Sequence, residues 1–177
     1  MRPDIPTAVS AVEAEALAAL SHGKKVLEVG SLLGFSTITM ALNADHVTSL
    51  DPHTGYPKDN PRPTWDKFLN NLGKYRVGHK VRAIKGYDAE LGKPPLINER
   101  FDFAFIDATG LYQDTFRILT RVWPLMRGLS IVAVHDYGLH EWPGAKMAVD
   151  EFCTHLTVGH LDTLALIRKY PDSGARL

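Results

Sequence analysis

The segment VLEVGSLLGFST, residues 26–37, decides the fold. A β-rich run leads into a turn that carries Gly30 and Gly34, and a helical pattern begins at Phe35. Glycine permits a turn with an unusual φ angle and lets a ligand approach the backbone closely. The free N–H groups at the mouth of the following helix suit a carboxylate or a phosphate. The segment therefore predicts a strand–turn–helix unit with a ligand at the turn.

The next chemical signal is Asp51, which follows the β-rich run His46 to Leu50. A carboxylate at this distance from a glycine turn can accept hydrogen bonds from two vicinal ribose hydroxyls. An aspartate before a proline can also simply cap a turn, but the pairing with the glycine turn favours ribose binding. The turn lacks the G-x-G-x-x-G pattern of nicotinamide enzymes, because the residue two positions before Gly30 is Glu28 and the residue two positions after it is Leu32. A nicotinamide oxidoreductase is therefore a weaker alternative.

Outward from this segment, short β-rich runs alternate with stretches of helical period. The alternation predicts an α/β fold, namely a doubly wound, mostly parallel seven-stranded sheet with helices on both faces and an antiparallel last strand. We expect one domain over residues 1–177, with an accessory N-terminal helix at about 8–22 that Ser10 and Glu13 cap. The predicted strands are 25–29, 46–50, 81–84, 101–106, 129–134 and 163–167, and the later helices are 35–42, 64–74, 112–126 and 145–156.

Composition excludes several classes of protein. The chain has 20 Lys+Arg against 20 Asp+Glu, with 45% hydrophobic and 23% charged residues, which excludes bulk disorder. A single cysteine, Cys153, excludes a disulfide scaffold and a four-thiolate zinc site. The apolar runs are too short to span a membrane, and acidic residues interrupt the N-terminal apolar stretch as they do not in a secretory signal. We therefore expect a cytoplasmic protein that does not contact membranes.

One stretch of the chain is basic. Between Lys67 and Lys85 there are six Lys or Arg residues and no acid. Such a stretch is typical of a solvated face, and it could also receive an anionic substrate or a nucleic acid. The overall neutrality of the chain argues against nucleic acid, so a nucleic-acid-modifying enzyme is a secondary alternative.

Eight segments in order resemble a class I S-adenosylmethionine-dependent methyltransferase, and within it the small O-methyltransferase group related to macrocin O-methyltransferase. They are VLEVGSLLGFST, TSLDP, TWDKFLNNL, VRAIKGYDAEL, FDFAFIDA, IVAVHDYG, PGAKMAVDEF and TLALIRK. The resemblance implies transfer of the methyl group of S-adenosylmethionine to an oxygen of a small-molecule acceptor, such as a sugar or a phenol. It also implies a cofactor site made of Glu28, Gly30, Ser31, Gly34, Ser36, Asp51, Gly86, Tyr87, Asp88 and Asp107.

Within that implied site, the glycine turn surrounds the methionine part of the cofactor and Asp51 holds the ribose. Gly86, Tyr87 and Asp88 border the adenine, with Asp88 as a partner for its amino group. Tyr87 could equally be a surface aromatic, and Asp88 could cap a short helix.

The implied catalytic residues are Asp107, His135 and Asp136. In the resembling family a divalent ion such as Mg²⁺ is often held at these strand ends, which makes Asp107 and Asp136 metal candidates, although both could merely cap turns. The chain departs from the family's D-G-D-H-S-Y pattern, because Thr109 and Gly110 replace its second aspartate and its histidine. His135 is the remaining candidate base. The departures also support a rival, a non-catalytic module that only binds the cofactor.

Two loops are expected to overhang the site. They are His53 to Pro63 and Tyr137 to Pro143, and their aromatic residues Tyr56, Tyr137 and Trp142 could stack on an acceptor. An acceptor pocket built from loops alone would be open, so we expect a second copy of the chain to close it in a homodimer.

Overall fold

The computed structural model describes residues 2–55 and 62–171, and in this part of the chain one seven-stranded sheet has the order β3-β2-β1-β4-β5-β7-β6. Strands β1 to β5 are parallel, and β7 runs antiparallel to both β5 and β6. This confirms the predicted fold class. The strands are β1 (Lys25–Val29), β2 (His46–Asp51), β3 (Val81–Lys85), β4 (Phe101–Ile106), β5 (Met126–Val134), β6 (Val158–Leu161) and β7 (Leu164–Arg168).

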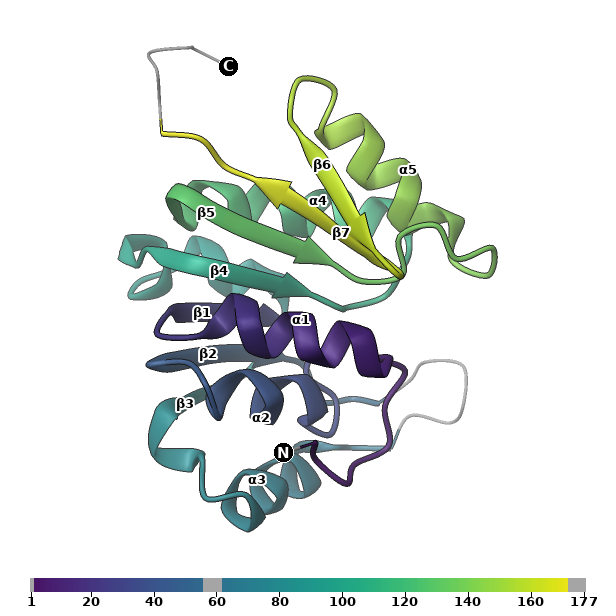
Figure 1. The fold of residues 1–177 in the computed structure, drawn as a ribbon. Helices are drawn as coiled ribbons and strands as arrows, with labels where there is room; N and C mark the ends of the chain where they lie inside the picture. The colour runs from purple at the N-terminus through teal and green to yellow at the C-terminus, as the bar shows by residue number, and fades with distance from the viewer. Residues whose placement is uncertain (1, 56–61, 172–177) are drawn as a thin grey trace.

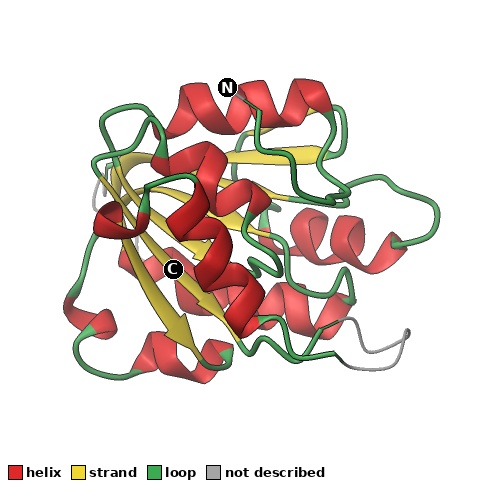
Figure 2. Cartoon of the chain, turned by 90° about the horizontal axis from the view of Figure 1, so that it is seen from below, coloured by secondary structure: helices red, strands yellow, loops and turns green. Residues whose placement is uncertain are grey.

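Helices cover both faces of the sheet, and each face has its own hydrophobic core (Figures 1 and 2). Figure 1 shows α1 and α2 in front of the sheet and α4 behind it. Helices α1 to α3 contribute to one core, and α4 and α5 contribute to the other. The helices are α1 (Ala11–Ser21), α2 (Phe35–Ala41), α3 (Trp65–Lys74), α4 (Tyr112–Val122) and α5 (Pro143–Phe152).

The central strand β4 shows why these segments form a covered sheet. Side chains alternate between the two faces of a strand. Phe103 and Phe105 accordingly lie in the core beneath α1 to α3, while Ala104 and Ile106 lie in the core beneath α4 and α5. A strand that is apolar on both faces is stable only when both faces are covered.

Some element boundaries differ from the sequence predictions. Strand β6 was not among the predicted ranges, because it is an edge strand that is mostly exposed and therefore has no apolar pattern. Strand β5 begins at Met126 instead of Leu129. Helix α4 ends at Val122 instead of Met126, because Pro124 lacks the N–H that a further α-helical turn requires and a 3₁₀ turn follows instead.

The topology places the carboxyl ends of β1, β2, β4 and β5 along one edge of the sheet. The strand order reverses between β1 and β4, and ligands of open α/β sheets bind outside the carboxyl ends at such a point. Asp51, Asp107 and His135 follow or end three of these strands. The fold therefore gathers the residues that the sequence places at strand ends.

Two further features concern partners. Among the residues with described positions, no helix combines the length and apolar character that crossing a membrane requires. In the basic stretch, Arg82 pairs with Glu99 at 2.6 Å and Lys80 donates to the Ala44 carbonyl at 2.9 Å. Part of the stretch thus serves local packing.

Candidate cofactor site and active site

The glycine turn after β1 packs directly against the end of β4. Gly30 has a φ of +93°, and a Cβ atom at this position would lie 2.0 Å from the carbonyl oxygen of Asp107. The Gly30 N–H donates to the Leu50 carbonyl at 2.9 Å, which ties the same turn to β2. Only glycine fits here, because a side chain would collide with backbone that cannot move without distorting the sheet.

Asp51 organises the turn through its carboxylate. Its Oδ2 accepts from the N–H groups of Ser31 at 2.7 Å and Leu32 at 2.9 Å, and its Oδ1 accepts from the His53 N–H at 2.5 Å. A carboxylate has about four lone-pair directions, so three backbone donors leave one of them on Oδ1. Asp51 therefore keeps acceptor capacity beyond its contacts with the turn, and its predicted contact with ribose hydroxyls stays a prediction.

Beneath the turn lies a buried carboxyl group. Glu28 is fully buried, and the hydroxyls of Ser36, at 2.6 Å, and Thr37 both donate to it. Burial raises the pKa of Glu28 to about 7, although the two hydroxyls favour its ionised form. Glu28 therefore anchors the start of α2 from below.

Ser31 offers a free polar atom at the turn. Its hydroxyl oxygen is buried and has no hydrogen-bond partner among the described residues. A buried hydroxyl without a partner is costly and calls for an explanation. A polar ligand at the turn would supply the missing partner.

Gly34 and Gly86 occupy crowded positions on either side of the site. Gly34 precedes α2 with a φ of +92°, and a Cβ there would lie 3.0 Å from the Phe68 ring. A Cβ on Gly86 would meet the Glu90 side chain at 2.8 Å. Both glycines let neighbouring segments pack closely.

The residues expected around adenine lie just after β3. Tyr87 is exposed. Asp88 begins a short 3₁₀ helix, and its carboxylate pairs with Arg117, at 2.9 Å, and with Arg121 of α4. These ion pairs bind the segment to α4, so an adenine amino group would share Asp88 with two guanidinium groups.

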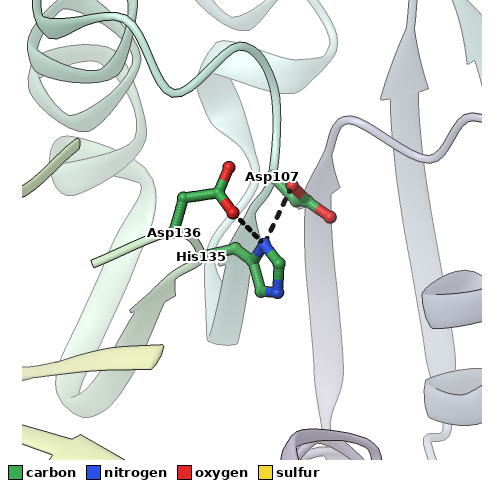
Figure 3. Close-up of side chains that lie close together, drawn as sticks. All are labelled: Asp107, His135 and Asp136. Carbon is green, nitrogen blue, oxygen red and sulfur yellow. Dashed lines mark ion pairs between the residues drawn. The ribbon is translucent and has the colours of Figure 1, made fainter. Parts of the chain in front are cut away.

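Asp107, His135 and Asp136 come together at the ends of β4 and β5 (Figure 3). The Nδ1 atom of His135 lies 3.4 Å from an oxygen of Asp107 and 3.0 Å from an oxygen of Asp136. One ligand atom from each residue falls within a 4.8 Å cluster. Asp136 has a φ of +64°, a left-handed conformation that aspartate tolerates better than most residues. This turn brings the Asp136 carboxylate to the ring of the preceding residue, His135.

Glu13, on α1, is the member of the site that the sequence interpretation missed. Its Oε2 lies 3.2 Å from Nε2 of His135, and both side chains are almost fully buried. The predicted capping box with Ser10 is confirmed, so the residue was identified only as part of a helix cap. The available signal was its position on the buried face of α1, beside Ala14 and one turn before Leu17.

The carboxylates determine the charge of His135. Burial lowers its pKa, but Asp107, Asp136 and Glu13 outweigh burial and raise the pKa to about 12. Burial likewise raises the pKa of Glu13, but hydrogen bonds from His135, Thr163 and Ser10 outweigh it and lower that pKa to about 2. In these surroundings His135 is an imidazolium at neutral pH, which cannot accept a proton. Its role as a general base stays a prediction and requires that the Nδ1 proton first be displaced.

Gly110, which replaces the family's histidine, lies against Trp142. It has a φ of +65°, and a Cβ there would lie 3.0 Å from the indole ring. The Trp142 ring therefore occupies space that a side chain at position 110 would need. Of the other loop aromatics, Tyr137 donates its hydroxyl to Asp150 of α5 at 2.9 Å, and Tyr56 lies outside the described residues.

Gly110→Ala is expected to lower the free energy of unfolding by about 1 to 2 kcal/mol, because it adds left-handed strain and a tight contact with Trp142. Urea unfolding would measure the loss. Gly138→Ala is the matched control, since Gly138 has a φ of +84° but nothing within 4 Å of its Cβ position. Equal losses in the two variants would show that the contact with Trp142 has no cost.

A cavity of about 340 Å³ lies beside the glycine turn. Its lining includes Thr7 from the N-terminal segment, Leu32 from the turn and Lys67 from α3. Leu32 and Leu33 are the turn residues that line it, whereas Gly30, Ser31 and Asp51 are not part of its lining. The cavity therefore lies next to the predicted cofactor residues without including them.

Comparison with known proteins identifies the family. A family model described as a methyltransferase domain matches residues 27–137. Among solved structures, an O-methyltransferase from Bacillus cereus in complex with SAH has a TM-score of 0.70 at 19% identity, with 95% of this chain and 84% of that chain covered. TomG from Streptomyces achromogenes, an O-methyltransferase of tomaymycin synthesis solved with SAM, has a TM-score of 0.69 at 19% identity, with 95% and 83% covered.

The O-methyltransferase NovP has a TM-score of 0.75 at 19% identity, with 93% of this chain and 82% of that chain covered. At these identities the three structures show a shared fold. The family model spans more than half of the sequence, and the residues it matches include the glycine turn, Asp51, Asp107 and Asp136. The chain therefore belongs to the methyltransferase domain family.

Proposed function

We propose that the protein transfers the methyl group of S-adenosylmethionine to an oxygen of a small-molecule acceptor, such as a sugar or a phenol. The observation that carries the proposal is the convergence of the glycine turn, Asp51 and the unpaired Ser31 hydroxyl at the carboxyl ends of β1 and β2. Crystal structures of similar fold hold SAM or SAH, which supports the choice of cofactor.

The chain's own groups fit this cofactor. The unpaired Ser31 hydroxyl is available to the methionine part, and the remaining lone pair of Asp51 is available to a ribose hydroxyl. Gly30 lets the turn lie directly against the backbone that follows β4, which brings the turn close to Asp107. S-adenosylmethionine supplies an activated methyl group on a sulfonium, so the protein's task is to align an acceptor oxygen with that methyl group and exclude water.

In this proposal the acceptor oxygen lies beside Asp107 and Asp136. Their carboxylates face one another across Nδ1 of His135, and both are partly accessible to solvent. Two aspartates and an imidazole form a donor set that fits a divalent ion. The chemistry that such an ion supplies is a lowered pKa for the acceptor hydroxyl. In this proposal Asp107 and Asp136 orient the acceptor hydroxyl. The Trp142 ring, which lies against Gly110, lines the acceptor pocket.

The remaining expectations stay predictions. A homodimer that closes the acceptor pocket, a small-molecule acceptor rather than nucleic acid and a cytoplasmic location all belong to this proposal. Analytical ultracentrifugation tests the homodimer. Retention of the protein on immobilised nucleic acid at low ionic strength tests the choice of acceptor, and no retention is expected.

Asp51→Ala is expected to weaken S-adenosylhomocysteine binding by about tenfold or more, because it removes a charged acceptor and releases the turn at Ser31 and Leu32. Isothermal titration calorimetry would measure the affinity. Thermal shift would report whether the ligand still raises the melting temperature above that of the ligand-free variant.

Asp45→Ala is the matched control, because Asp45 is exposed just before β2, at the opposite end of the strand from Asp51. Unchanged binding in Asp51→Ala would contradict the cofactor site. If the protein binds S-adenosylmethionine but never yields S-adenosylhomocysteine with a broad panel of hydroxylated acceptors, it is a non-catalytic module instead.

A further inference from the structure

Helix α1 contributes a buried carboxylate to the aspartate–histidine cluster. Glu13 and His135 are 122 positions apart in the chain, yet Oε2 and Nε2 lie 3.2 Å apart. The side chains of both residues are at most 3% exposed. The accessory helix therefore reaches the ring nitrogen of His135 that faces away from Asp107 and Asp136.

The other contacts of Glu13 fix its orientation. The N–H and the hydroxyl of Thr163 donate to Oε1 at 3.0 and 2.5 Å, and the N–H of Ser10 donates to Oε2 at 2.8 Å. Both Ser10 and Thr163 act here as donors, so Glu13 is held as an acceptor from both sides. It can pair with His135 only when Nε2 carries a proton.

We propose that Glu13 is a positioning residue that holds the proton of His135 on Nε2 and aims Nδ1 at Asp107 and Asp136, so that the cluster binds a first-row transition dication through one nitrogen and two oxygens. The inference deepens the proposed function and rests on it for the role of the ion beside the acceptor. It departs from the Mg²⁺ site expected from the sequence, which had oxygen ligands only.

The donor chemistry supports a transition ion. Imidazole nitrogen is a ligand for zinc and similar ions, whereas Mg²⁺ prefers carboxylates, water and substrate oxygens. A histidine that binds metal commonly donates its other N–H to a carboxylate, which fixes the ring and raises the basicity of the ligand nitrogen. Glu13, His135 and the two aspartates have this arrangement.

The backbone supports the same arrangement. The left-handed conformation of Asp136 turns the chain after β5, and the Nδ1 atom of His135 then lies between oxygens that come from two different strands. Binding of an ion requires that Nδ1 lose its proton to solvent, since a ligand nitrogen must be deprotonated. The aspartates that pair with the protonated ring then pair with the ion instead.

The test compares Zn²⁺ and Mg²⁺ binding by calorimetry in the full chain and three variants, without cofactor or acceptor. His135→Asn places an amide oxygen near the position of Nδ1 and removes the nitrogen ligand. We expect it to weaken Zn²⁺ binding by about 100-fold and Mg²⁺ binding by less than about threefold. Glu13→Gln is expected to weaken Zn²⁺ binding by about 10- to 100-fold.

Ser10→Ala is the matched control for Glu13→Gln. It removes the hydroxyl that caps α1 and leaves the Glu13 carboxylate and its contact with His135 in place. If Ser10→Ala weakens Zn²⁺ binding as much as Glu13→Gln does, the effect comes from a loosened helix and the proposal is overturned.

Nuclear magnetic resonance of ¹⁵N-labelled histidine gives a readout that a purely structural role would not change. With Zn²⁺ added, we expect Nε2 of His135 to keep its proton while the Nδ1 resonance moves to the metal-bound range. A ring that stays protonated on both nitrogens at saturating Zn²⁺ would overturn the proposal, because His135 would then be a permanent counterion of the three carboxylates.

S-adenosylhomocysteine binding, measured on the same samples, separates this inference from the proposed function. If the unmodified chain does not bind S-adenosylhomocysteine but binds Zn²⁺ as expected, the proposed function is refuted and the Glu13–His135 arrangement still stands. Normal S-adenosylhomocysteine binding, with Zn²⁺ binding no more sensitive to His135→Asn than Mg²⁺ binding, would refute the inference alone.

Discussion

Gly30→Ala is expected to lower the free energy of unfolding by about 3 to 5 kcal/mol. The added Cβ would lie 2.0 Å from the carbonyl oxygen of Asp107 and 2.5 Å from its carbonyl carbon. Both atoms belong to backbone that follows β4, so relief requires β1 and β4 to separate at their carboxyl ends. The φ of +93° adds strain for any residue with a side chain.

The melting temperature should fall by about 10 °C, given a few degrees per kcal/mol for a chain of this size. Urea unfolding followed by circular dichroism would measure the free energy directly. Gly23→Ala is the matched control, because Gly23 also has a positive φ, of +63°, but nothing within 4 Å of its Cβ position. If the two variants lose the same stability, the proposed contact between the turn and β4 carries no energetic weight.

Gly30→Ala should also affect the proposed cofactor site. The turn that would move carries the Ser31 and Leu32 N–H groups that donate to Asp51. Affinity for S-adenosylhomocysteine is therefore expected to fall along with stability, even under conditions in which the variant is still folded.

Glu28→Gln is expected to remove a pH dependence of stability worth about 3 kcal/mol. Burial raises the pKa of Glu28 from 4.5 to about 7 in the folded protein. Between these two pH values the folded state keeps a proton that the unfolded chain has released. The stabilising contribution of the protonated group is therefore complete below about pH 4.5, falls as the pH rises towards 7 and stays constant above that.

Glutamine is neutral at every pH and can still accept from the hydroxyls of Ser36 and Thr37, which both donate to Glu28. The free energy of unfolding of Glu28→Gln, relative to the unmodified protein, should therefore rise between pH 4.5 and pH 8. Urea unfolding at several pH values would measure this difference. Glu15→Gln, on the exposed face of α1, is the control, and a difference that does not change with pH would contradict the buried position of the Glu28 carboxyl.

Much of the fold follows from local pattern. The strand–turn–helix at residues 26–37 is recognisable because an apolar strand, a glycine turn and a helix start each have local preferences that agree. The bounds of β1 and β4 match their predicted residues, since apolar periodicity defines both, and α1 lies within its predicted range of about 8–22. Strand β6 escaped prediction because an exposed edge strand needs hydrogen bonds to β7 and no apolar pattern of its own.

The candidate site was predictable only in part. A parallel sheet brings the carboxyl ends of its strands to one edge, so Asp51, Asp107 and Asp136 could be assigned to a single region from the sequence. Their partners could not. Asp88 is paired with Arg117 and Arg121 because α4 packs against the segment after β3. No sequence pattern near Asp88 predicts this contact.

The sequence by itself determined the order of the polar groups along the chain: a glycine turn, then Asp51, for which we propose ribose binding, then acidic groups after β4 and β5. These features depend on the backbone preferences of neighbouring residues, which the sequence states directly. Only the tertiary structure decided that Glu13 contacts His135 and that Trp142 covers Gly110. Such contacts join segments far apart in the chain, and the packing of helices on a twisted sheet, rather than any local preference, selects them.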